Sequence, residues 1–232
     1  MQLLSYKKGR IWAVSAEKMT KERLIIFTRY PEQGLTKTRL IPALGAQGAA
    51  TLHRQMTEHT LSKVRELHCL RPLSVEVRFT GGNLALMRDW LGSDIVYRNQ
   101  GTGDLGSRMA RSHQSALRAG MERLAIIGTD CPGLNAELMA QAFHQLHYHD
   151  LVLGPAMDGG YYLIGLRCFM PALFSEISWG TAEVLQQTVH IAKKLDLSVA
   201  YLSELADVDR PEDLPVWEEQ MRDWKRAEEA GI

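Results

Sequence analysis

The sequence has 232 residues, of which 45% are hydrophobic and 23% charged, a balance typical of globular proteins and unlike that of fibrous or disordered chains. Lysine and arginine total 27, as do aspartate and glutamate, so no net positive charge attracts nucleic acid or an anionic membrane. The three cysteines form no CxxC pair, which favours neither a zinc site nor a disulfide framework and fits reduced thiols in the cytoplasm.

Residues 1–20 are expected to form a loosely attached extension, and residues 21–232 a single domain. The N-terminal apolar run, Ile11 to Val14, is too short for the hydrophobic region of a signal peptide. No window approaches the roughly 20 apolar residues that a membrane-spanning helix needs. We therefore expect no membrane span.

Short apolar runs alternate with amphipathic helical patterns along the rest of the chain. Strands are predicted at 24–28, 73–79, 95–97, 124–127, 151–154, 161–166 and 199–202, and helices at 52–67, 84–91, 108–119, 136–146 and 184–195, followed by a charged C-terminal helix. This alternation predicts parallel βαβ units. The runs at 151–154 and 161–166 are too close together for a crossover helix, which predicts a locally mixed sheet. The expected fold is a three-layer, Rossmann-like α/β/α sandwich with a mostly parallel mixed sheet.

The loop after the first strand, Thr28 to Arg39, is a candidate phosphate site. Its candidate ligands are hydroxyl and cationic side chains, namely Thr28, Arg29, Thr36, Lys37, Thr38 and Arg39. It is not a Walker P-loop, because no lysine directly follows Gly34 and position 29 is arginine. A solvated basic loop is the alternative reading.

The segment Gly101-Thr-Gly-Asp-Leu-Gly106 matches GxGxxG between a predicted strand and a predicted helix. Against dinucleotide binding, polar residues at 98–100 separate the apolar strand from the first glycine, and the segment is not the first βα turn. A structural turn would explain the glycines equally well.

Carboxylates follow three of the later strands. Asp130 comes directly after a buried strand, where it can hold Mg²⁺ or Mn²⁺ or serve as a turn former. One carboxylate rarely suffices for a metal, and Asp207 and Asp209 in the loop after the last strand are candidate partners. Asp158 stands beside Gly159 and Gly160, which permit close approach of a ligand but also suit a hairpin.

Downstream of these glycines, aromatic and hydroxyl side chains are candidates for binding a sugar. Tyr161 directly follows them, Trp179 offers a stacking face and Thr181 a hydroxyl. Trp179 is equally well explained as a core residue or a hydrophobic staple.

These motifs occur together in one order: Phe27-Thr-Arg-Tyr-Pro-Glu-Gln-Gly-Leu-Thr-Lys-Thr-Arg-Leu40, Gln100-Gly-Thr-Gly-Asp-Leu-Gly-Ser-Arg-Met109, Gly128-Thr-Asp-Cys-Pro-Gly-Leu134, Gly154-Pro-Ala-Met-Asp-Gly-Gly-Tyr-Tyr-Leu-Ile-Gly-Leu166 and Asp207-Val-Asp-Arg-Pro-Glu-Asp-Leu214. Over residues 22–215 the chain resembles the bacterial glycosyltransferase-A-fold family known as radical-SAM/selenodomain-associated transferase 1 or arsenosugar-biosynthesis glycosyltransferase. Gln33 and Leu35 depart from the residues expected in that family, but the cationic residues are intact.

The resemblance implies a nucleotide-diphospho-sugar transferase fold, shared more distantly with nucleotidyltransferases of the molybdenum-cofactor guanylyltransferase type. It places the nucleotide phosphates at the first loop and the metal and diphosphate at Asp130. It also makes Gly101 to Arg108 a nucleotide-contacting loop, with Gly103, Asp104 and Arg108 as candidate contacts.

The function expected first is glycosyl transfer from a nucleotide-diphosphate sugar to a small-molecule acceptor, assisted by Mg²⁺ or Mn²⁺ at Asp130 and Asp209. Lys37 or Arg39 would stabilise the departing diphosphate, and Asp158 would orient or deprotonate the acceptor hydroxyl beside the substrate-binding residues Gly159, Gly160, Tyr161, Trp179 and Thr181. Nucleotidyl transfer with release of pyrophosphate is the alternative, and a non-catalytic nucleotide-binding protein is a further one. The sequence leaves a homodimer open.

Overall fold

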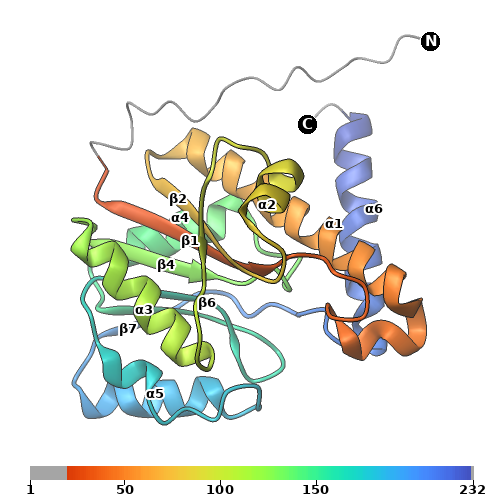
Figure 1. Ribbon diagram of the computed structural model, residues 1–232. Helices are drawn as coiled ribbons and strands as arrows, with labels where there is room; N and C mark the ends of the chain where they lie inside the picture. Colours follow the sequence, from red (N-terminus) through yellow and green to blue (C-terminus); the bar gives the residue numbers. More distant parts are fainter. Residues whose placement is uncertain (1–19, 231–232) are drawn as a thin grey trace.

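The structure, a computed structural model, describes residues 20–230. Of the predicted N-terminal extension, residues 1–19 lie outside this range. The described chain forms one seven-stranded sheet with helices on both faces (Figure 1). The strands are β1 (Glu22–Arg29), β2 (Ser74–Thr80), β3 (Val96–Asn99), β4 (Arg123–Ile127), β5 (Leu151–Pro155), β6 (Tyr161–Leu166) and β7 (Val199–Tyr201).

The order of the strands is β3-β2-β1-β4-β6-β5-β7. β6 runs antiparallel to both of its neighbours, β4 and β5, and every other pair is parallel. The predicted mixed sheet is therefore confirmed. Its cause is the tight connection between β5 and β6, where Gly159 has a φ of 87° and the Ala156 amide donates to the carbonyl of Gly160 over 3.1 Å.

Within residues 20–230, six α-helices connect and cover the strands: α1 (Ile41–Leu70), α2 (Leu84–Leu91), α3 (Leu105–Arg118), α4 (Ala136–Gln145), α5 (Val184–Lys194) and α6 (Leu214–Ala230). Short 3₁₀ turns, η1 (Thr38–Leu40), η2 (Pro171–Phe174) and η3 (Pro211–Asp213), lie in the loops. The first helix was expected at 52–67 and is longer, because it begins eleven residues earlier and crosses a break at Gly45 (φ 71°). The apolar periodicity begins only after that break.

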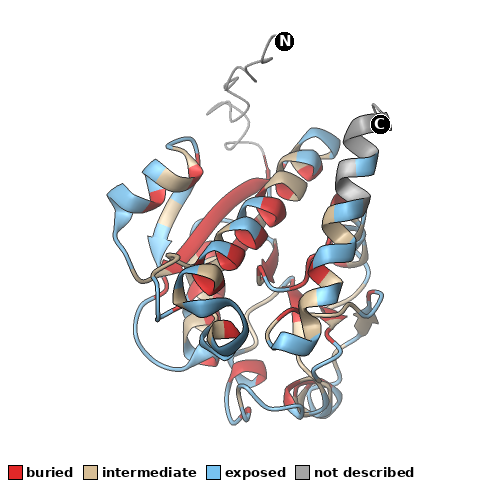
Figure 2. Ribbon diagram, turned by 90° about the vertical axis from the view of Figure 1, so that its right-hand side faces the viewer, coloured by how far each residue is buried: buried red, intermediate tan, exposed pale blue. Residues whose placement is uncertain are grey.

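The two faces of the sheet carry separate hydrophobic cores. Leu24 and Ile26 of β1 pack with α1, α2 and α4, whereas Ile25 packs with α3 and α5. This alternation is the expected pattern for a strand covered on both faces, and it confirms the three-layer architecture. A third cluster joins Met56 of α1 to Trp217 of α6, so the first part of the C-terminal helix packs against α1 (Figures 1 and 2).

The parallel strands β1, β2, β3 and β4 all end at one edge of the sheet. The loops that follow them carry most of the residues predicted to bind a ligand. β6 runs in the opposite direction, so the turn that precedes it, with Asp158, reaches the same edge. This edge is where ligands bind in open α/β sheets.

Candidate functional site

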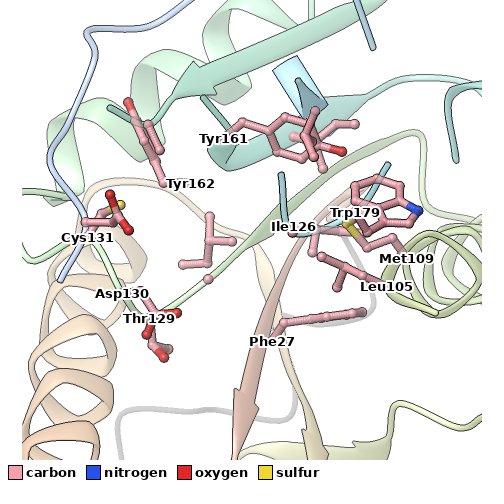
Figure 3. A pocket seen from close by; sticks show the side chains of 18 of the residues that line it. Phe27, Leu105, Met109, Ile126, Thr129, Asp130, Cys131, Tyr161, Tyr162 and Trp179 are labelled. Carbon is pink, nitrogen blue, oxygen red and sulfur yellow. The ribbon is translucent and has the colours of Figure 1, made fainter. Parts of the chain in front are cut away.

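A pocket of about 420 Å³ opens at this edge (Figure 3). Its walls come from the ends of β1, β2 and β4, the start of β6, helices α1 and α3 and the loop before α5. The residues lining it are Phe27, Thr28, Arg29, His53, Thr80, Gln100, Leu105, Met109, Ile126, Ile127, Gly128, Thr129, Asp130, Cys131, Ala156, Asp158, Gly160, Tyr161, Tyr162, Ile164, Trp179, Gly180, Thr181, Val184 and Asp207.

The pocket has two chemically different ends. Three carboxylates, those of Asp130, Asp158 and Asp207, form the acidic end. Six carbon-rich side chains form the apolar end: Phe27, Leu105, Met109, Ile126, Tyr161 and Trp179. Figure 3 places Asp130, with Cys131 and Tyr162, at one side of the pocket and these six residues at the other. A ligand that fills the pocket therefore meets both environments.

Eight of the predicted site residues line this pocket. They come from five separate loops and strands and are Thr28, Arg29, Asp130, Asp158, Gly160, Tyr161, Trp179 and Thr181. Arg29 is half-buried, and its Nε atom is inaccessible to solvent and has no hydrogen-bond partner among residues 20–230. The residue lines the pocket, and a positive charge there suits an anionic ligand.

Lys37 lies beside the acidic end rather than in the pocket lining. Its side chain is only 4% exposed, and its Nζ lies 2.9 Å from Asp130 Oδ1 and 3.7 Å from Asp209 Oδ1. Nζ also donates to the carbonyl of Val208 over 2.5 Å. Arg39 pairs with the other oxygen of Asp209. The two predicted metal ligands thus share a lysine ammonium.

The backbone and charge state of Lys37 follow from this placement. Its φ of 49° lies in the left-handed region, which a lysine rarely adopts and which local contacts must stabilise. Burial alone lowers the pKa of Lys37, but the charges of Asp130 and Asp209 outweigh it and raise that pKa. Desolvation opposes ionisation of Asp130, yet Lys37 holds the pKa of this carboxyl below its usual value. Both groups are charged at neutral pH.

The remaining predicted residues lie outside the lining. Thr36 is buried and donates to the carbonyl of Tyr30 over 3.3 Å, and Thr38 is exposed at the start of η1. The side chain of Asp104 caps α3 by accepting from the Ser107 amide. Arg108 donates to the carbonyl of Gly103 over 2.8 Å. Gly159 packs closely on the backbone of Ala182. In this structure these residues shape loops.

Two buried polar residues at the pocket, which the sequence did not predict, hold the start of the first loop. His53 of α1 lies 3.0 Å from the carbonyl of Arg29 and 3.3 Å from the hydroxyl of Thr28, so it holds the start of the first loop. Gln100 donates its amide to the carbonyls of Thr28 and Arg78, both over 3.1 Å. Both side chains are buried. A polar residue directly before the glycines was the available signal for Gln100.

The loop after β7 carries two candidate partners of Asp130, Asp207 and Asp209. Of these two, Asp207 lines the pocket. Burial raises the pKa of Asp207, and the nearby charge of Asp158 raises it further. The carboxylates at the acidic end therefore repel one another. Bringing a cation between them relieves that repulsion.

The carboxylate oxygens beside Lys37 are suitable ligands for a hard divalent cation. Asp130 and Asp209 offer carboxylate oxygens, the ligands that Mg²⁺ and Mn²⁺ prefer, and both already approach one cationic atom. Within residues 20–230 no three His, Cys, Asp or Glu side chains converge on a preformed site. A cation there would compete with Lys37 for these carboxylates.

None of the helices in the described range is sufficiently long and apolar to cross a membrane.

Comparison with solved structures identifies similar folds. A protein from Desulfovibrio desulfuricans, provisionally assigned as a nucleotide-diphospho-sugar transferase, is 34% identical, with a TM-score of 0.77 and coverage of 83% of this chain and 84% of that one. The 4-diphosphocytidyl-2C-methyl-D-erythritol synthase of Anaerococcus prevotii is 12% identical (TM-score 0.60, covering 90% and 100%).

A manganese complex of a Mycobacterium tuberculosis protein is 14% identical (TM-score 0.51, covering 84% and 97%). These two more distant similarities establish the fold alone. No curated protein matches the sequence. Residues 60–181 match the family described as "Uncharacterized protein conserved in bacteria (DUF2064)". The chain therefore belongs to this family, and its fold is that of the nucleotide-diphospho-sugar transferases.

Proposed function

We propose that this protein transfers a glycosyl group from a nucleotide-diphosphate sugar to a small-molecule acceptor. The observation that carries the proposal is the meeting of cations and carboxylates at one end of a pocket on a nucleotide-diphospho-sugar transferase fold. Arg29 and Lys37 supply positive charge, and Asp130, Asp158 and Asp207 supply negative charge. A diphosphate held by a divalent cation needs both kinds of group.

Arg29 and Lys37 are assigned to the diphosphate. Arg29 lines the pocket, so its guanidinium charge can attract a phosphate oxygen there. Lys37 can exchange a carboxylate for a phosphate oxygen, because its ammonium already bonds oxygen atoms at the edge of the pocket. Both cations stabilise negative charge that develops on the leaving diphosphate.

Asp130 and Asp209 are assigned to the divalent cation. When bound, Mg²⁺ or Mn²⁺ would neutralise the diphosphate and so make it a better leaving group. The manganese complex of a protein with the same fold supports this choice of ion.

Asp158 is the candidate base. It is exposed at the pocket, and its Oδ1 accepts from the amide of Gly160 over 2.8 Å, which fixes the orientation of the carboxylate. A carboxylate held in this way can accept the proton of an acceptor hydroxyl.

Nucleotidyl transfer is the second candidate, because the synthase of A. prevotii has the same fold. The two reactions differ in the released product: a nucleoside diphosphate in glycosyl transfer, and pyrophosphate in nucleotidyl transfer. The first loop is poorer in glycine than the entrance of nucleotidyltransferases, which favours glycosyl transfer. We place the reaction in the cytoplasm, where the three unpaired cysteines would remain reduced.

The test is to incubate the protein with Mn²⁺ and a panel of nucleotide sugars and nucleoside triphosphates, and to measure both products. Release of a nucleoside diphosphate that Asp130→Asn abolishes would support the proposal. The control is Asp89→Asn, which removes an exposed carboxylate on α2. Pyrophosphate release would favour the second reaction, and an absence of both products with every donor would argue for a non-catalytic nucleotide-binding protein.

A further inference from the structure

Apolar side chains from several elements line the apolar end of the pocket. Phe27 and Ile126 come from adjacent strands, and Met109 comes from α3 above them. Leu105, the first residue of α3, is 42% exposed at this place. A large exposed aliphatic side chain next to a pocket lowers the free energy of binding an apolar ligand.

The two aromatic residues at this end, Tyr161 and Trp179, also present carbon. Both side chains are partly buried, but the hydroxyl of Tyr161 and the indole nitrogen of Trp179 are inaccessible to solvent. The indole nitrogen lies against α3 at Gly106, where an added Cβ would stand 2.6 Å from it. The two rings pack edge to face, with 6.4 Å between their centroids. The accessible parts of both residues are therefore ring faces and edges.

The nearby hydroxyl of Thr181 is already engaged. It donates to the carbonyl of Ser178 over 2.8 Å and accepts from the amide of Glu183 over 3.3 Å. A polyhydroxylated ring at this end would give up hydrogen bonds to water and gain few in return. A flat apolar or aromatic ring would lose nothing and would bury its surface.

The position of this end relative to Asp158 indicates which substrate it receives. Tyr161 follows Asp158 by three residues, and Gly160 between them also lines the pocket. The candidate base thus stands at the boundary between the acidic and the apolar end. The diphosphate, by contrast, requires the cations Arg29 and Lys37.

We infer that the acceptor is a hydroxyl compound with an aromatic or similarly apolar ring, of which a phenol is the simplest example. The ring occupies the apolar end and the hydroxyl faces Asp158. This inference rests on the proposed glycosyl transfer. Asp158 takes the hydroxyl proton, the oxygen bonds to the anomeric carbon, and the bond from that carbon to the diphosphate breaks, with its electron pair leaving on the nucleoside diphosphate.

The experiment measures binding of 2-naphthol by titration calorimetry, alone and with saturating nucleoside diphosphate and Mn²⁺. We expect saturable binding that persists when the nucleotide is present, and no comparable binding of glycerol or glucose. Leu105→Ser should weaken 2-naphthol binding about fivefold, because part of the apolar wall is lost. Trp179→Leu is a second variant, expected to weaken it at least as much.

Leu84→Ser is the matched control. Leu84 is the first residue of α2, follows an Asx cap as Leu105 does, and is 41% exposed away from the pocket. It should leave 2-naphthol binding unchanged.

Three results would overturn the inference: no saturable binding of 2-naphthol, equal binding of glucose, or displacement of 2-naphthol by nucleoside diphosphate, which would make this end the nucleobase site. Failure of the proposed function is distinguishable, because it would abolish nucleoside diphosphate release from every nucleotide sugar while leaving naphthol binding intact.

Discussion

Replacing Lys37 with methionine removes the ammonium that Asp130 and Asp209 share while keeping the buried stem of the side chain. A hydrogen bond to a charged group contributes about 1.5–3 kcal/mol. Asp130 is 51% exposed and can regain water, which places the expected loss at about 2 kcal/mol of unfolding free energy. For a domain of this size that corresponds to a melting temperature lower by about 4–8 °C.

The same substitution should change the response to a divalent cation. With Lys37 gone, the two carboxylates lack their shared cation, so Mn²⁺ without nucleotide should stabilise Lys37→Met more than the wild type. Thermal unfolding with and without Mn²⁺ measures both effects. Lys21→Met is the control, because Lys21 forms a 2.9 Å ion pair with Glu122 on the exposed surface, and its loss should lower the melting temperature less than the loss of the Lys37 ammonium.

An unchanged melting temperature for Lys37→Met would refute the structural role of the ion pairs. A greater Mn²⁺ stabilisation of the wild type than of Lys37→Met would refute the idea that lysine and metal compete for the same carboxylates.

Asp158→Asn should lower turnover of nucleotide sugar by about 10²–10⁴-fold with donor affinity within about twofold of wild type, as steady-state kinetics and calorimetry would measure; an equal loss of both would assign Asp158 to binding. Burial lowers the pKa of His113 to about 4. Its unfolded pKa is about 6.5, so stability should fall by up to about 3 kcal/mol as the pH drops from 6.5 to 4. His113→Phe should flatten that dependence in urea titrations, and an unchanged slope would contradict it. Gly106→Ala should cost about 1–3 kcal/mol in thermal unfolding despite its gain in helix propensity, because the new Cβ would collide with the Phe174 carbonyl and the Trp179 indole; a stabilised variant would show that α3 can shift freely.

The seven strands could be located from the sequence because most are short apolar runs between helical patterns. The local reversal of direction was also predictable, since residues 156–160, which separate β5 from β6, are too few for a crossover helix. The start of α1 was not predictable, because Gly45 interrupts the helix and the segment before Gly45 lacks apolar periodicity.

The edge strand β3 shows a limit of hydrophobic patterning. Three of its four residues are exposed, so its polar character did not exclude a strand. Gln100, directly after it, is buried because its amide bonds carbonyls of β1 and β2. The polar residues at 98–100 therefore reflect the position of β3 at the edge of the sheet. They do not argue against a turn at Gly101.

At the candidate site, Thr28, Asp130 and Asp158 could be proposed from their places beside strand ends, and all three line the pocket. The ion pairs of Lys37 could not be predicted, because its carboxylate partners are 93 or more residues away along the chain. Only the folding of the chain brings them close to Lys37. The same holds for the apolar end of the pocket, whose side chains come from β1, β4, β6, α3 and the loop before α5.

Metal-assisted binding of a nucleoside diphosphate is tested most directly by titration calorimetry of the wild type and Asp130→Asn with the nucleoside diphosphates of uridine, guanosine, adenosine, cytidine and thymidine, each with and without Mn²⁺. We expect at least one diphosphate to bind the wild type about tenfold or more tightly when Mn²⁺ is present, and Asp130→Asn to lose this enhancement. Equal affinity with and without Mn²⁺ for every diphosphate, or an enhancement that survives in Asp130→Asn, would contradict this expectation.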